Sequence, residues 1–198
     1  MTDAAPTIDP QHTALLVMDY QQAIVGMIED SDALVARAAQ AIDLVRGQGG
    51  HVGYVRVAFT DADLQDIPPT SRMGARIAAG PQAFHDDSPS TQIDERVAPR
   101  DGDMIVRKTR VGAFSTTNLA QQLSERGIDT LILAGISTSG VVLSTVRDAS
   151  DRDYALYVLS DATADREASV HACLMEQVFP RQADVITVAE LDGLLSSS

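Results

Sequence analysis

The chain has 198 residues, a length that suits one compact domain over residues 1–198 with a substantial core. Hydrophobic residues make up 44% and charged residues 22%, an ordinary globular mixture that excludes wholesale disorder, collagen-like repeats and coiled-coil arrays. Lys and Arg number 15 against 28 Asp and Glu. The resulting net charge of −13 repels phosphate backbones and anionic lipids, so we expect neither a nucleic-acid nor a membrane partner.

The first part of the chain predicts a strand, a helix and a second strand. Residues 13–18 form a continuous apolar run, typical of a strand buried on both faces, and the run ends at Asp19. From Ser31 or Asp32, which are good helix caps, apolar residues recur at helical spacing until Gly47, Gly49 and Gly50. A strand is predicted at 51–57, and strands in such a unit pair in parallel.

The stretch 58–100 is rich in proline and shows little periodicity. Connections of this length usually line a site or make an oligomer contact. A poorly ordered surface excursion is the alternative interpretation.

The second half alternates strands with helices. We predict strands at 103–108, 130–135, 154–159 and 184–188. One helix is predicted from Thr116 or Thr117 to about Arg126, and two others at 167–178 and 189–195. A further helix follows Gly135 and has Val142, Val146 and Ala149 on one face. The alternation predicts an α/β domain: a doubly wound, mostly parallel sheet of six strands with helices on both faces, the three-layer Rossmann type.

Three polar features follow strands of this predicted sheet: Asp19, Lys108 and the turn at 135–145. Ligands of open α/β sheets bind beyond the carboxyl ends of the strands, so these features are expected to meet. A lone acid or lysine there is more often solvated, but two opposite charges in a dry crevice stabilise each other. The turn enters a helix through small and hydroxyl residues. Its free N–H groups suit an oxyanion, although capping of the helix by Ser137, Thr138 or Ser139 is sufficient to explain these residues.

Four motifs resemble those of the isochorismatase-like hydrolases, the cysteine hydrolase superfamily of nicotinamidases, N-carbamoyl amidohydrolases and isochorismatases. They are LLVMDYQ at 15–21, GD at 102–103 with Lys108, GAF and TNL after it, GIDTLILAG at 127–135, and DA at 161–162. The resemblance runs from about residue 13 to 195. It implies the fold predicted above, catalytic roles for Asp19 and Lys108, a cis peptide bond between Ile136 and Ser137, and a homodimer or homotetramer.

The resemblance fails at the position of the family's catalytic cysteine. The family's glycine, threonine, cysteine, valine and threonine are matched by Gly135, Thr138, Val141, Val142 and Thr145. A valine side chain has no lone pair and cannot attack a carbonyl, so the thiol route is closed at Val141.

The sequence contains one cysteine, Cys173, which excludes an intrachain disulfide and a cysteine-based zinc site. Cys173 lies on a predicted helix with Leu174 and Val178, where we expect a small apolar filler of the core.

Metal-binding members of the family carry an aspartate and histidines in the loop after the second strand. Here that loop holds Asp61 and Asp63 without a histidine, and isolated loop aspartates are usually solvated. His85 lies farther along, and nothing in the sequence pairs it with them. We therefore expect no metal and no other cofactor.

Two functions fit these residues. The first is a hydrolase of a small molecule that works without a thiol, as the isochorismatase branch does. The resemblance then implies Asp19 as general acid on a vinyl ether, with Lys108 orienting it or holding a substrate carboxylate. Backbone amides at Ile136, Ser137 and Gly140 would bind developing negative charge. Because a lysine favours the ionised carboxylate, a general acid here requires burial or a bound anion to raise its pKa.

The second function is that of an inactive or reassigned member that binds a small molecule or a protein partner. The bulk of Val141 favours this alternative, whereas retention of both charged residues favours the hydrolase, because a charged pair in a crevice is costly to keep as mere structure.

Residues 1–6 lack a basic and an apolar segment, and no apolar run approaches the roughly 18 residues of a membrane span, so a cytoplasmic location is expected.

Overall fold

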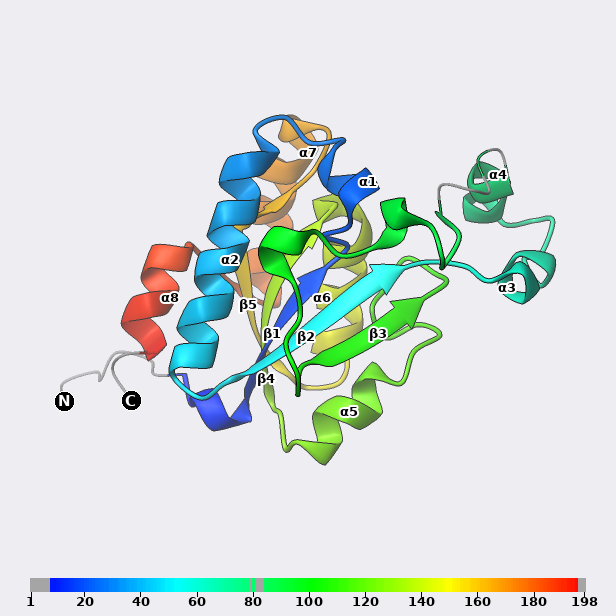
Figure 1. Cartoon of the computed structure of the whole chain (residues 1–198). Coiled ribbons are helices and arrows are strands. Elements are labelled where there is room, and N and C mark those ends of the chain that lie inside the picture. Colours follow the sequence, from blue (N-terminus) through cyan, green and yellow to red (C-terminus); the bar gives the residue numbers. More distant parts are fainter. Residues whose placement is uncertain (1–7, 79, 81–83, 196–198) are drawn as a thin grey trace, which may run out of the picture.

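The computed structural model describes residues 8–78, 80 and 84–195, and its centre is a six-stranded sheet. Neighbouring strands all run parallel, in the order β3-β2-β1-β4-β5-β6 (Figure 1). The strands are β1 (Thr13–Met18), β2 (His51–Val57), β3 (Met104–Lys108), β4 (Thr130–Ile136), β5 (Ala155–Ala164) and β6 (Asp184–Ile186). The order reverses between β1 and β4, which is where sheets of this kind place their ligands.

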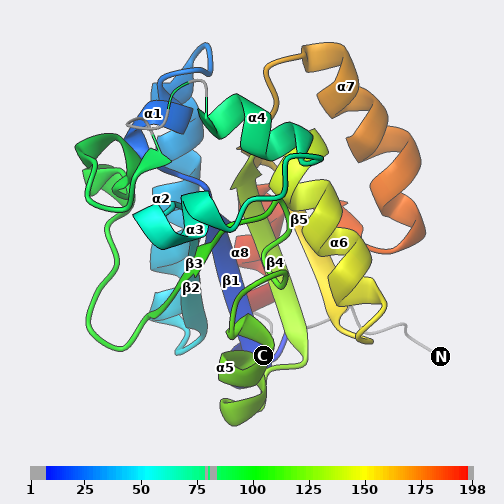
Figure 2. The same ribbon diagram turned by 90° about the vertical axis from the view of Figure 1, so that its right-hand side faces the viewer.

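Helices cover both faces of the sheet, as the sequence predicts (Figure 2). The helices are α1 (Gln22–Val25), α2 (Ser31–Gly47), α3 (Asp61–Gln65), α4 (Arg72–Ala78), α5 (Leu119–Glu125), α6 (Leu143–Ser150), α7 (Ala168–Cys173) and α8 (Val188–Leu195). Residues of α2 and α8 pack in one apolar cluster, and residues of α5 and α6 pack in the other. Within the described stretches, no helix has the length and apolar character needed to cross a bilayer.

The central strand β1 explains why the apolar run at 13–18 is continuous. Leu15 and Val17 join the cluster on the α2 face, whereas Leu16 and Met18 join the cluster on the opposite face. Side chains alternate between the two faces of a strand, so a strand covered on both sides needs apolar residues at every position. The carboxyl end of β1 is thereby held at the middle of the sheet edge.

Several helices and strands begin or end at other residues than predicted. Helix α5 begins at Leu119, because the Thr117 hydroxyl donates to the carbonyl of Ala113 and accepts from the Leu119 N–H instead of capping a longer helix. Strand β6 ends at Ile186. Ser31 begins α2 and does not cap it; no side chain caps that helix start.

Residues 58–100 contain more regular structure than their composition predicts. Helices α3 and α4 stand out from the body beyond the carboxyl end of β2 (Figure 1). A reciprocal pair of bonds caps α3: the Asp63 N–H donates to Thr60 Oγ1, and the Thr60 N–H donates to Asp63 Oδ2. Thr60 followed three residues later by Asp63 is a sequence signal for the start of a helix, and a search for hydrophobic periodicity does not detect it.

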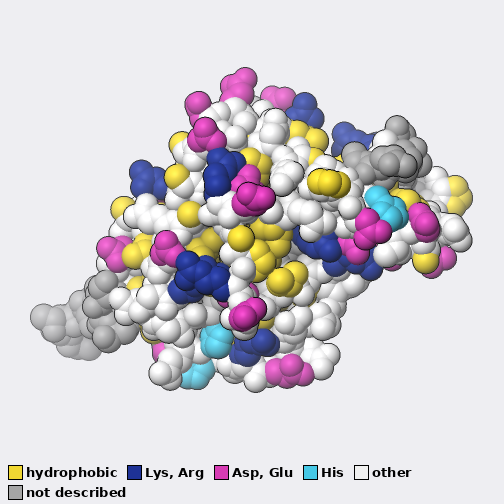
Figure 3. Space-filling view, in the orientation of Figure 1, with side chains coloured by type: hydrophobic (Ala, Val, Ile, Leu, Met, Phe, Trp, Pro, Cys, Tyr) yellow, Lys and Arg dark blue, Asp and Glu magenta, His cyan; other side chains and the backbone are white. Residues whose placement is uncertain are grey.

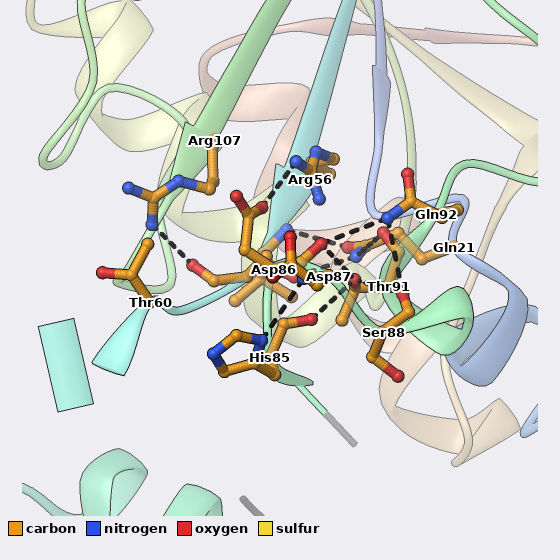
Figure 4. Close-up of polar contacts among 12 residues, drawn as sticks. Gln21, Arg56, Thr60, His85, Asp86, Asp87, Ser88, Thr91, Gln92 and Arg107 are labelled. Atoms are coloured by element: carbon orange, nitrogen blue, oxygen red, sulfur yellow. Dashed lines mark hydrogen bonds and ion pairs between the residues drawn. The ribbon is translucent and has the colours of Figure 1, made fainter. Parts of the chain in front are cut away.

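The segment that returns from α4 is anchored to β2 through Gln21. The Gln21 side chain donates to the carbonyls of Val57 at 2.8 Å and Thr91 at 2.6 Å, and accepts from the Val57 N–H at 2.8 Å. Arg56 and Asp86 add an ion pair of 2.6 Å (Figure 4). The path of the 85–92 segment is therefore tied to the sheet edge where polar residues were predicted to meet.

Cys173 is exposed, so the prediction that it fills a gap in the core is wrong. The predicted helix at 167–178 is α-helical only as far as Cys173 and continues as a π-helix over Leu174–Val178. The side chains that this stretch buries are those of Leu174 and Met175, which leaves the thiol on the outer face.

Candidate functional site

Asp19 and Lys108, predicted to meet at the sheet edge, are in direct contact. Asp19 follows β1, Lys108 ends β3, and Asp19 Oδ2 lies 2.9 Å from Lys108 Nζ. Their side chains are 8% and 2% exposed, so the pair is almost completely removed from water. Lys108 is the single lysine of the sequence, and its Nζ also donates to the carbonyl of Arg110 at 3.2 Å.

The backbone at Asp19 turns its carboxyl group into the site. Asp19 has φ 59°, in the left-handed region that aspartate tolerates better than most residues. Its N–H donates to the carbonyl of Val55 at 2.8 Å, which continues the sheet bonding of β1 by one residue. Within the described part of the chain, Asp19 Oδ1 is buried and has no hydrogen-bond partner. One oxygen therefore holds the lysine, and the other has no partner among the described residues.

Burial raises the pKa of Asp19 above its ordinary value, although the charge of Lys108 and the hydrogen bond from it act in the opposite direction. Desolvation is the largest effect because the carboxyl group has almost no contact with water. The burial that a general acid beside a lysine requires is therefore present.

A cavity of about 800 Å³ opens beside this pair. All six residues predicted for the site line it: Asp19, Lys108, Ile136, Ser137, Gly140 and Val141. Apolar side chains from β2, the segment after it and α4 form much of the remaining wall: Val57, Phe59, Met73, Ile77 and Phe84. Of the two interpretations of residues 58–100, the structure supports the one in which they line a site.

The turn after β4 forms one side of the cavity. The Ile136–Ser137 peptide bond is cis, as the family resemblance implies. At Gly140 an added Cβ would lie 2.7 Å from Ser137 Oγ, so a side chain at this position would require the hydroxyl to move. The Gly140 N–H donates to the carbonyl of Ser137 at 3.2 Å. An oxyanion role for these amides stays a prediction.

Three arginines that the sequence did not single out also line the cavity. They are Arg72 and Arg76 of α4 and Arg166, which follows β5. An arginine in an irregular stretch gives no signal by itself, and only the path of α4 brings the first two to the cavity.

The aspartates considered as metal ligands have other contacts. Asp63 Oδ2 caps α3 and pairs with Arg107 at 2.6 Å. Asp61 is largely exposed, and the structure does place it near His85, with 3.4 Å between Oδ1 and Nε2. Among residues 8–78, 80 and 84–195, no three His, Cys, Asp or Glu side chains are grouped to hold a metal ion. That no metal is used remains a prediction.

Residues 13–190 match the model of one protein family, described as Isochorismatase domain. The chain belongs to the isochorismatase family. This membership covers both strands that meet at the reversal of the sheet and every residue predicted for the site.

Similar proteins agree on the fold of this isochorismatase-family chain. The uncharacterized isochorismatase family protein YwoC of Bacillus subtilis is 34% identical over 176 residues, which cover 88% of this chain and 89% of the relative. Maleamate amidohydrolase of Pseudomonas putida is 27% identical over 183 residues, covering 88% and 82%. A solved structure described as a cysteine hydrolase from Pseudomonas syringae matches with a TM-score of 0.87 at 25% identity, covering 100% and 99%. The predicted fold is confirmed.

No cysteine lines the cavity of this isochorismatase-family chain within the part that the structure describes. Cys173, the single cysteine, lies on α7 with its side chain exposed. On the wall formed by the turn after β4 stands Val141, which is 2% exposed and packed in an apolar cluster. The charged side chains that line the cavity are those of Asp19, Lys108, Arg72, Arg76 and Arg166.

Proposed function

We propose that this isochorismatase-family hydrolase acts on a small molecule without a thiol nucleophile, with Asp19 as general acid and base. The observation that supports this most strongly is the buried Asp19 Oδ1, which has no partner among the described residues and belongs to a cavity without a thiol. Buried polar atoms are nearly always hydrogen-bonded, and an exception at a cavity wall suits contact with a ligand.

Each predicted residue has a task in this proposal. Protonated Asp19 gives its proton to the substrate, which for a vinyl ether is the terminal carbon of the double bond. Water then adds to the resulting cation while the Asp19 carboxylate takes up its proton, and the product falls apart into a carbonyl compound and an alcohol. Lys108 holds Asp19 Oδ2 and so orients the acid. The backbone amides at Ile136, Ser137 and Gly140 are expected to bind negative charge that develops on the substrate.

The proposal extends to the assembly and location of the protein. We expect a homodimer or homotetramer in the cytoplasm, with a small-molecule substrate and no nucleic-acid partner. The net charge of −13 supports the last point, because it opposes binding to phosphate backbones.

Turnover of a panel of vinyl ethers, esters and amides tests the proposed function. We expect the wild-type protein to hydrolyse at least one of them and the Cys173→Ser variant to be equally active, because this thiol is exposed and does not line the cavity. Loss of activity in Cys173→Ser would contradict a mechanism without a thiol. Ligand binding that raises Tm in the absence of any turnover would instead support the non-catalytic alternative.

Replacing Val141 with cysteine, in a Cys173→Ser background, is expected to add a reactive thiol to the cavity. Asp19 lines the same cavity, and a carboxylate within reach of a thiol takes its proton and activates it. Mass spectrometry after iodoacetamide treatment should show one added group per chain, and adding Asp19→Asn should slow the labelling. The Cys173→Ser protein, which has no thiol, is the control. An unreactive thiol at position 141 would count against the proposed equivalence with the family's nucleophile.

A further inference from the structure

The turn after β4 carries three residues of the cavity, Ser137, Gly140 and Val141. Thr138 and Ser139 lie between them in the sequence but do not line the cavity. The turn continues as a π-helix whose start receives no hydrogen bond from the Ser137 side chain. The side chains that hold this helix start come instead from the segment after β5 and from α7.

Asp165 holds Ser139 by two hydrogen bonds. Strands β4 and β5 end side by side, with Ile136 paired to Ala164, so the residue after β5 lies against the turn after β4. Asp165 Oδ2 accepts from the Ser139 N–H at 2.7 Å and from the Ser139 hydroxyl at 2.6 Å. A carboxylate that accepts from an N–H group at a helix start stabilises that start. Asp165 therefore caps a helix that lies far from it in the sequence.

His171 holds the neighbouring residue of the turn. It lies on α7, and its Nδ1 is 2.8 Å from Oγ1 of Thr138, a residue that is completely buried. Partial burial lowers the pKa of His171, while the charge of Asp165 acts in the opposite direction, so the imidazole is neutral at pH 7. A neutral imidazole nitrogen and a hydroxyl can bond with either one as the donor, so both tautomers of His171 hold Thr138.

The charge state of Asp165 strengthens its contact with the turn. Partial burial acts to raise the pKa of Asp165, but the hydrogen bonds that it accepts, first of all from Ser139, lower the pKa below its ordinary value. The carboxylate is therefore ionised at neutral pH, and its bonds to Ser139 are charge-assisted. Acidic side chains are scattered over the visible face of the molecule, so a carboxylate near the turn has little meaning by itself (Figure 3). The two bonds to one residue of the turn are what distinguish Asp165.

We propose that Asp165 and His171 are positioning residues, which hold Ser139 and Thr138 and so fix the turn after β4 relative to Asp19. This inference rests on the proposed function, because the turn carries backbone amides that are expected to bind negative charge in that reaction. Neither Asp165 nor His171 lines the cavity, so each acts through the turn and not on the substrate. A displacement of about 1 Å within a site can cost about 100-fold in rate, so the hold on the turn affects catalysis.

Steady-state kinetics of Asp165→Ala test the contact with Ser139. We expect kcat to fall about tenfold to 100-fold while KM changes by less than about threefold, because amides that bind developing charge act mainly in the transition state. Asp165→Asn should restore most of kcat. A single oxygen of Asp165 accepts both bonds from Ser139, and the oxygen of an asparagine can do the same.

Glu190→Ala is the matched control. Glu190 Oε2 accepts from the N–H and the hydroxyl of Thr187 at 2.7 Å and 2.8 Å, the same pair of bonds directly before α8, and Glu190 does not line the cavity. Its kcat should equal that of the wild-type protein, with near-ultraviolet circular dichroism to show that each variant is folded. Equal kcat in Asp165→Ala and Glu190→Ala, or no recovery in Asp165→Asn, would overturn the proposal.

The contact of His171 is tested from both of its ends. His171→Leu and Thr138→Val each remove the hydrogen bond between these side chains, and each should lower kcat with little change in KM. Because both substitutions remove the same bond, the double variant should be no slower than the slower single variant. Losses that multiply in the double variant would show that the two residues act independently and would contradict the role of His171.

Labelling of the thiol introduced by Val141→Cys, in the Cys173→Ser background, reports on the turn without turnover. Asp165→Ala should slow the reaction with iodoacetamide about tenfold, because the thiol is then no longer held near the carboxylate of Asp19 that activates it. Position 141 is buried, so a turn that had only become loose would expose the thiol and speed its labelling. Faster or unchanged labelling would therefore overturn the proposal.

The labelling needs no substrate, so this inference and the proposed function fail separately. If Asp19→Asn abolishes hydrolysis while Asp165→Ala and His171→Leu keep the kcat of the wild-type protein, the proposed function stands and the positioning inference is wrong. If Asp165→Ala slows the labelling while Asp19→Asn keeps full hydrolytic activity, the hold on the turn stands and the catalytic role of Asp19 is wrong.

Discussion

Replacing Asp19 with asparagine is expected to lower kcat/KM by about 100- to 10,000-fold, the usual contribution of a positioned general acid or base. Asparagine has nearly the same shape and keeps an oxygen toward Lys108, but it carries no proton that it can transfer. The measurement is the steady-state hydrolysis of the best substrate found in the panel, with near-ultraviolet circular dichroism to show that the variant is folded.

The catalytic role of Asp19 also predicts how kcat/KM of the wild-type protein changes with pH. The acid works only while protonated, so kcat/KM is expected to decline as the pH rises through the pKa of Asp19. Burial raises that pKa, which places the decline at a higher pH than for an ordinary carboxyl group. Lys108 is the main opposing influence, and Lys108→Met should therefore move the decline to still higher pH.

Asp192→Asn is the matched control for the loss of a carboxylate, because Asp192 lies exposed on α8 and does not line the cavity. Its activity should equal that of the wild-type protein. Undiminished activity in a folded Asp19→Asn variant would rule out proton transfer by this residue.

Lys108→Met is expected to lower the free energy of unfolding by about 3–5 kcal/mol, the usual cost of removing one partner from a buried ion pair. Methionine has a similar unbranched length, so the loss is mainly electrostatic. Asp19 would keep its buried position without the Nζ that now lies 2.9 Å away. Urea denaturation measures the change, which is a large fraction of the roughly 5–15 kcal/mol that stabilises a domain.

Combining Asp19→Asn with Lys108→Met should restore part of this loss, because no charge then remains buried alone. The exposed pair of Arg100 and Asp43, at 3.6 Å and with side chains 67% and 72% exposed, provides the comparison. Arg100→Met should cost at most about 1 kcal/mol. Additive losses in the double variant would show that Asp19 and Lys108 contribute to stability independently.

The sequence predicted those parts of the fold in which one local pattern dominates. Strand β1 was correct to the residue, because a strand buried on both faces requires an unbroken apolar run. Asp19 and Lys108 were found for a related reason: parallel strands bring their carboxyl ends to one edge, so residues far apart in sequence meet there.

Other features depend on contacts that no local pattern reveals. Helix α4 is short and is carried by a segment that Gln21 anchors from another part of the chain. The positions of Arg72 and Arg76 at the cavity follow from that path. Cys173 was predicted to be buried like its neighbour Leu174, but it is exposed. Successive side chains of a helix point in different directions, so one residue can face the core while the next faces solvent.

The single lysine of this chain is buried against Asp19, which has a consequence for chemical labelling. Reagents that modify amines usually find many lysines on a protein surface, and their pattern says little about any one site. Here the sequence contains one lysine, and its Nζ is enclosed beside a cavity. Modification of Lys108 therefore reports on access to the cavity itself, because the sequence has no other lysine to be labelled.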